Sequence, residues 1–94
     1  MKTKTKEEKD YHEYIASLPC VACGDSPVHV HHCRFSAGIG QRGSHYFVLP
    51  LCPACHQGKE GIHGSPKIFE MRNGSEEQLL ATVIQQLWSF KNDV

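Results

Sequence analysis

Val28-His29-Val30-His31-His32-Cys33 decides how this 94-residue chain is expected to fold. Apolar and polar residues alternate along it, which predicts a β-strand whose successive side chains point to opposite faces. Val28, Val30 and His32 would share one face, and His29, His31 and Cys33 the other. The adjacent histidines His31 and His32 are therefore expected to lie on opposite sides, where one imidazole can bind a metal ion while its neighbour has another task.

Two Cys-x-x-Cys pairs flank this stretch, and together they supply four thiol groups. Four thiolates form the closed tetrahedral site that zinc prefers in structural positions. A chain this short has a thin apolar core, so a staple of this kind is expected. A redox pair is the alternative, but two matched pairs favour zinc. We predict a structural Zn²⁺ bound by Cys20, Cys23, Cys52 and Cys55, and a buried apolar role for the fifth cysteine, Cys33.

Helices are predicted on both sides of this strand, and the chain is predicted to form one small α+β domain. Proline, glycine and capping residues set the expected boundaries. The expected elements are a basic disordered tail at 1–5, a helix at 6–18, a second strand at 47–51, a short helix from 53 that carries Cys55 and His56, a helical segment at 66–72 and a last helix at about 76–90. The domain would span residues 6–94, with the last helix packed against the first.

Charge and hydropathy indicate where the protein is located more clearly than they indicate what it binds. The formal net charge is zero, yet residues 28–67 carry four basic side chains and one acidic one, a net +3. This net charge is equally consistent with an ordinary protein surface and with a surface that binds nucleic acid. No apolar run approaches the roughly 18 residues of a membrane span, and the Lys-rich start lacks a signal-peptide core. A cytoplasmic location is expected, where reduced thiols bind metal.

Histidines are more numerous near the cysteines than a purely structural domain needs. The six are His29, His31, His32, His45, His56 and His63. A strand with His-His, a loop, a second strand and a helix with His form the ββα-metal arrangement of HNH endonucleases. Residues 18–87 resemble the Ref-like, RecA-dependent HNH nucleases of phages. The resemblance rests on His-His-x-Arg at 31–34, Gly-x-Gly-x-Arg at 38–42, His-Tyr-x4-Leu-Cys at 45–52 and Ile-His at 62–63.

The resemblance implies roles for particular residues. His32 would be the general base, and His31 and His56 would hold one divalent ion, with His63 as an additional ligand. HNH enzymes usually have an Asn between the two histidines; none lies between His32 and His56, so His45 is the candidate for orienting the base. Arg34 and Arg42 would contact phosphate, while a surface role is equally open for each. For His29 a structural or exposed role is expected.

The function implied by the resemblance is metal-dependent hydrolysis of phosphodiester bonds in DNA, with Mg²⁺ or Mn²⁺ as the catalytic ion. The substrate would be single-stranded or displaced DNA, with a RecA filament as partner, in phage-associated recombination. The alternative is a non-catalytic zinc module that binds nucleic acid or protein. It accounts for the four cysteines and leaves the histidine pair without a role. An HNH fold without activity is a third interpretation, which the missing Asn keeps open.

Overall fold

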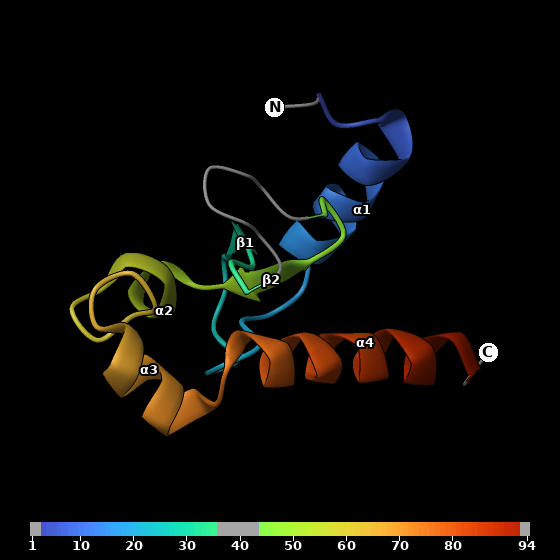
Figure 1. Cartoon of the computed structure of the whole chain (residues 1–94). Coiled ribbons are helices and arrows are strands. Elements are labelled where there is room, and N and C mark those ends of the chain that lie inside the picture. The colour runs from blue at the N-terminus through green and yellow to red at the C-terminus, as the bar shows by residue number, and fades with distance from the viewer. Residues whose placement is uncertain (1–2, 36–43, 93–94) are drawn as a thin grey trace.

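A computed structural model describes residues 3–35 and 44–92 of the chain (Figure 1). The elements in this part are α1 (Lys6–Ala16), β1 (His29–His32), β2 (Val48–Leu51), α2 (Pro53–Gln57), α3 (Pro66–Asn73) and α4 (Glu76–Asn92). The α+β class is thus confirmed. The predicted Gly-x-Gly-x-Arg segment, with Arg42, lies outside the described residues, as does the start of the predicted tail.

The two strands form an antiparallel pair that carries the histidines. His31 lies opposite Leu49 and His32 opposite Val48. All four residues of β2 are buried, so this apolar strand is part of the core. β1 is paired with it along its whole length. Beyond β1 the Cys33 amide still donates to the Phe47 carbonyl at 2.8 Å. The hairpin therefore fixes the backbone of His31 and His32 from the partner strand.

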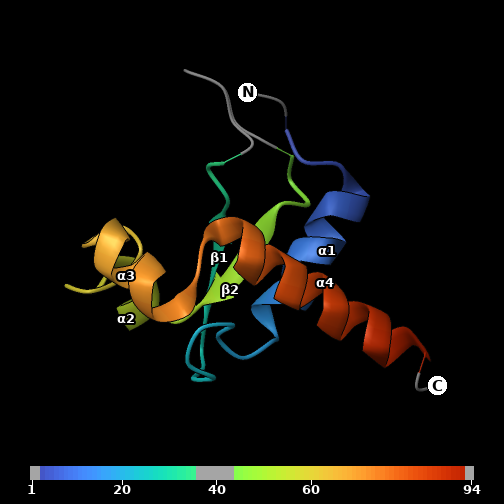
Figure 2. The ribbon, with the colours of Figure 1, turned by 60° about the horizontal axis from the view of Figure 1, so that its bottom comes forward.

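Helices α1 and α4 both pack against β2, as Figures 1 and 2 show from two directions. Helix α1 starts with a capping box between Thr5 and Glu8 and ends at Ala16, two residues before the predicted end. Helix α4 starts at the predicted capping sequence, where Ser75 and Gln78 exchange hydrogen bonds of 2.9 and 3.2 Å. The two helices join one core with β2 between them; their buried members are Ile15, Leu79, Leu80 and Val83.

Three large apolar side chains of α4 are exposed. Ile84, Trp88 and Phe90 retain 54%, 63% and 66% of their accessible surface. In the part of the chain that the structure describes, no helix combines the length and the apolar character needed to cross a bilayer.

Candidate metal centres

Four cysteine sulfurs converge at one end of the hairpin. Cys20 and Cys23 lie in the turn before β1, while Cys52 caps α2 and Cys55 lies on it. The turn closes through Gly24, whose φ of +86° suits glycine and whose amide donates to the Cys20 carbonyl at 2.8 Å. The four sulfurs lie within 4.8 Å of one another. The predicted ligand set is thus brought together, and its chemistry suits a structural zinc ion.

The pKa values of these thiols depend on their burial and on the hydrogen bonds around them. Burial opposes ionisation of Cys20, but backbone hydrogen bonds from Cys52, Cys23 and Ala22 outweigh it and lower its pKa to about 7. Burial, together with hydrogen bonds from the neighbouring thiols, raises the pKa of Cys55 well above its usual range. Because zinc binds thiolates, metal binding here releases protons, and the affinity rises with pH.

A second cluster joins three histidines from three segments. His31 comes from β1, His56 from α2 and His63 from the loop that follows α2. One ring nitrogen from each lies within 4.8 Å of the others. The ring centroids are 5.3 Å apart for His31 and His56, 5.1 Å for His31 and His63, and 4.7 Å for His56 and His63. These are the three histidines predicted as ligands of the catalytic ion, and three imidazoles suit a transition metal.

The loop after α2 is folded back so that His63 reaches this cluster. Its amides at Ile62 and His63 donate to the carbonyls of Cys55 and His56 at 2.8 and 3.0 Å. A Cβ atom at Gly61 would lie 2.6 Å from the Ala54 carbonyl oxygen, so only glycine fits there without a shift. The close approach of the loop to α2 is what places His63 beside His56.

Two imidazoles of this cluster, those of His56 and His63, have lowered pKa values, which favours their neutral form. Burial, and then the neighbouring His31, His63 and His29, lower the pKa of His56 to about 4. Burial and His31 also lower the pKa of His63. A neutral imidazole keeps the lone pair that a metal needs, so protons compete weakly at pH 7. His29 is exposed, as predicted for it, and its Nδ1 lies 2.9 Å from Nδ1 of His56.

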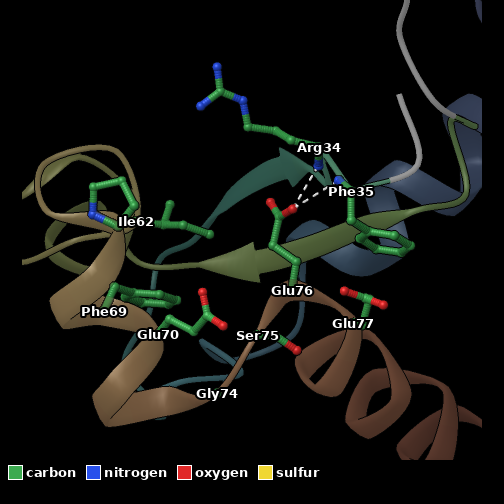
Figure 3. Close-up of a pocket in the computed structure, with 10 residues that line it drawn as sticks. Arg34, Phe35, Ile62, Phe69, Glu70, Gly74, Ser75, Glu76 and Glu77 are labelled. Atoms are coloured by element: carbon green, nitrogen blue, oxygen red, sulfur yellow. Dashed lines mark hydrogen bonds between the residues drawn. The ribbon is translucent and has the colours of Figure 1, made fainter. Parts of the chain in front are cut away.

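Glu76, on α4, contacts His31, and no pattern in the sequence indicates this contact. Its Oε2 lies 2.6 Å from Nε2 of His31, a residue that is 3% exposed. Its Oε1 accepts hydrogen bonds from the backbone amides of Arg34 and Phe35, at 2.8 and 3.2 Å (Figure 3). A carboxylate bound to one nitrogen of an imidazole fixes the ring and makes the other nitrogen a better ligand.

We expect Glu76→Gln to weaken metal binding at the His31 cluster by about tenfold, because the amide keeps the shape but not the charge, and loss of such a partner costs about 10–100-fold. Titration of zinc-loaded protein with Mn²⁺, followed by electron paramagnetic resonance, measures this. Glu77→Gln is the matched control, since Glu77 is the exposed neighbour on the same helix turn. Equal Mn²⁺ affinities in the two variants would contradict the role of Glu76.

The opposite face of β1 carries a third cluster. Nε2 of His32 lies 3.3 Å from Nδ1 of His45, so the predicted base and its predicted orienting residue are brought together. A third histidine joins them: His12 from α1, which is 7% exposed. Its ring centroid is 5.2 Å from that of His32 and 6.0 Å from that of His45. His12 was absent from the residues that the sequence singled out.

The predicted phosphate contacts are only partly described. Arg34 follows β1, is exposed, and extends its guanidinium away from Glu76 in Figure 3. Arg42 lies outside the described residues. A pocket of about 250 Å³ opens beside Glu76; its walls include Phe35, Ile62, Phe69 and Glu70 (Figure 3). The exposed Arg34 side chain lines this pocket at the end of β1, where it could contact a ligand.

The fold and these clusters define a small α+β protein with candidate metal sites on a histidine-bearing hairpin. Residues 1–90 match the family described as "Protein of unknown function (DUF968)", so the chain belongs to that family. It is also similar to "Uncharacterized protein YdfU" of Escherichia coli (strain K12), with 28% identity over 81 residues. That alignment covers 84% of this chain and 22% of the relative, so the chain spans about a fifth of the relative's length.

Proposed function

We propose that this chain is a metal-dependent DNA endonuclease of the HNH class. The observation that carries the proposal is the cluster of His31, His56 and His63, with His32 as the next residue on the same strand. The hairpin holds His31 and His32, the short helix α2 holds His56, and the loop after α2 holds His63, which follows the order of the HNH arrangement. The proposal gives each of these histidines a task, which a purely structural zinc module does not.

The role of the His31 cluster is to hold one divalent ion at the scissile phosphate. When bound, such an ion supplies positive charge to the developing oxyanion and the leaving oxygen. Mn²⁺ tolerates imidazole ligands well, and Mg²⁺ would take its remaining ligands from phosphate oxygens and water. His56 contributes a ring that is neutral at pH 7, since burial lowers its pKa to about 4.

His32 would accept a proton from the attacking water as general base. His45 lies 3.3 Å from it and takes the place of the usual HNH Asn, so that its imidazole orients the base. A base needs a fixed ring and one accepting nitrogen near the reacting water. His31 and His32 are consecutive, with Cα atoms about 3.8 Å apart, but their side chains point to opposite faces, so a phosphate that meets both tasks would have to lie across the edge of β1.

The resemblance to Ref-like nucleases extends the proposal to the substrate. Single-stranded or displaced DNA would be cut, with a RecA filament as partner, in phage-associated recombination. The zero net charge supports a need for such a partner, because few phosphate contacts give weak and salt-sensitive DNA binding. Arg34 would contribute a phosphate contact at the end of β1, and Arg42 a second.

The test is cleavage of DNA in Mn²⁺ or Mg²⁺ by protein that carries zinc in the cysteine cluster alone, with and without RecA-coated single strands. We expect His56→Ala to lower the rate by about 10²-fold or more, because the ion loses a ligand. Gln57→Ala is the control: it changes an exposed residue of the same helix. Cutting without RecA would keep the nuclease and remove the partner. No cutting by any folded variant would overturn the proposal and favour a non-catalytic zinc module.

A further inference from the structure

We propose that His12, His32 and His45 form a second histidine metal site, which takes Zn²⁺ or a similar borderline ion such as Co²⁺. The three rings come from α1, from β1 and from the segment before β2. One nitrogen from each lies within 4.8 Å of the other two. The site lies across β1 from the His31 cluster, because His31 and His32 point to opposite faces of the strand.

The spacing of the nitrogens fits shared coordination. Two nitrogens bound at about 2.0–2.1 Å to one tetrahedral ion are separated by about 3.3 Å. Nε2 of His32 and Nδ1 of His45 lie 3.3 Å apart. That separation is long for a hydrogen bond between two imidazoles, whereas it matches the separation of two ligands on one zinc ion.

His12 is held in place as a metal ligand would be. Its Nε2 lies 2.6 Å from the His45 carbonyl oxygen, and its Nδ1 lies 3.3 Å from Nζ of Lys4. The nitrogen that donates to a carbonyl fixes the ring in the way that outer-shell partners orient metal-bound histidines. A bound ion would replace one of these two contacts, and the other would continue to orient the ring. The lysine contact is the easier to give up, since its ammonium sits on a flexible stem.

The donor set selects the ion. Three imidazoles without a carboxylate suit Zn²⁺, Co²⁺, Ni²⁺ and Cu²⁺ and are poor ligands for Mg²⁺. With three protein ligands, a fourth position stays open for water. The site would also tie α1 to the hairpin, because His12 is a buried residue of α1.

This site gives zinc a second effect on the protein, and that consequence rests on the proposed function. An ion bound by His32 occupies the lone pair that the general base needs. Zinc at this site would therefore inhibit cleavage, while Mg²⁺ or Mn²⁺ at the His31 cluster supports it. The chain would cut DNA only when free zinc is low.

Titration with Co²⁺ tests the site without reference to activity. With zinc in the cysteine cluster, we expect wild type to bind two equivalents of Co²⁺, and His12→Gln and His56→Ala to bind one each. Glutamine at position 12 can still donate to the His45 carbonyl, which protects the fold. In wild type, the imidazole resonances of His12, His32 and His45 should broaden in NMR spectra as the second equivalent binds. Equal Co²⁺ counts in wild type and His12→Gln, or sharp His32 and His45 resonances, would overturn the site.

Cleavage then tests the consequence. The readout is the ratio of rates with and without added Zn²⁺, compared within each variant. We expect that ratio to fall at least tenfold in wild type and to change much less in His12→Gln. An equal fall in both would overturn inhibition through this site. If no variant cuts DNA, the proposed function fails while the Co²⁺ counts still decide the site.

Discussion

Replacing the exposed Cys23 by serine is expected to unfold this protein, whereas replacing the buried Cys33 by alanine is expected to cost only about 1 kcal/mol. Burial alone predicts the opposite order, since Cys33 is 3% exposed and Cys23 is on the surface. The difference comes from the metal. Structural zinc contributes about 10–16 kcal/mol in small zinc-binding peptides, as much as or more than the whole stability of a small domain, about 5–15 kcal/mol.

Circular dichroism at increasing temperature measures this difference in the zinc-loaded variants, and a metal assay counts the bound zinc. Cys33→Ala should keep its zinc and melt cooperatively a few degrees below wild type. Cys23→Ser should lose zinc and most of its helical signal, as wild type should after a strong chelator is added. A Cys23→Ser variant that melts above Cys33→Ala would show that the four-cysteine cluster does not hold the fold.

Features that depend on residues close together in the chain could be predicted from the sequence. The alternation in residues 28–33 predicted that the side chains of His31 and His32 would point to opposite faces of the strand. In the structure they have different neighbours, His56 beside His31 and His12 beside His32. The cysteine pairs were predictable for the same reason, because two residues at Cys-x-x-Cys spacing point at one position whatever the wider fold. The helix starts followed from local signals, which are a proline in the first turn at Pro53 and Pro66 and the capping residue Ser75.

Partners that meet only through tertiary packing were not predictable. Glu76 lies 45 positions from His31 in sequence, and nothing in its local pattern distinguishes it from other helix-start acids. His12 did have a signal: it precedes the buried Ile15 by three positions, so both lie on one face of α1. A polar residue on a buried helix face needs a partner, and His45 supplies one through its carbonyl.

His32→Ala is the second large effect that we expect, a loss of about 10²-fold or more in the rate of DNA cleavage. The substitution removes the proposed base and leaves His31, His56 and His63 in place. Single-turnover rates measured in Mn²⁺ with saturating protein isolate the chemical step. Binding of Mn²⁺ at the His31 cluster should stay within a few-fold of wild type. A parallel loss of Mn²⁺ binding would show that the defect lies in the ion site.

Two comparisons separate a base from a structural residue. Added imidazole should restore part of the rate to His32→Ala, because a small base can enter the space that the side chain leaves, and it should not help His56→Ala. His45→Gln should lower the rate less than His32→Ala does, since a residue that orients the base acts only through it. If His32→Ala cuts as fast as wild type, another group accepts the proton from the attacking water. His32 would then be only a metal ligand, together with His12 and His45. The Co²⁺ count would then assign all three histidines to that site alone.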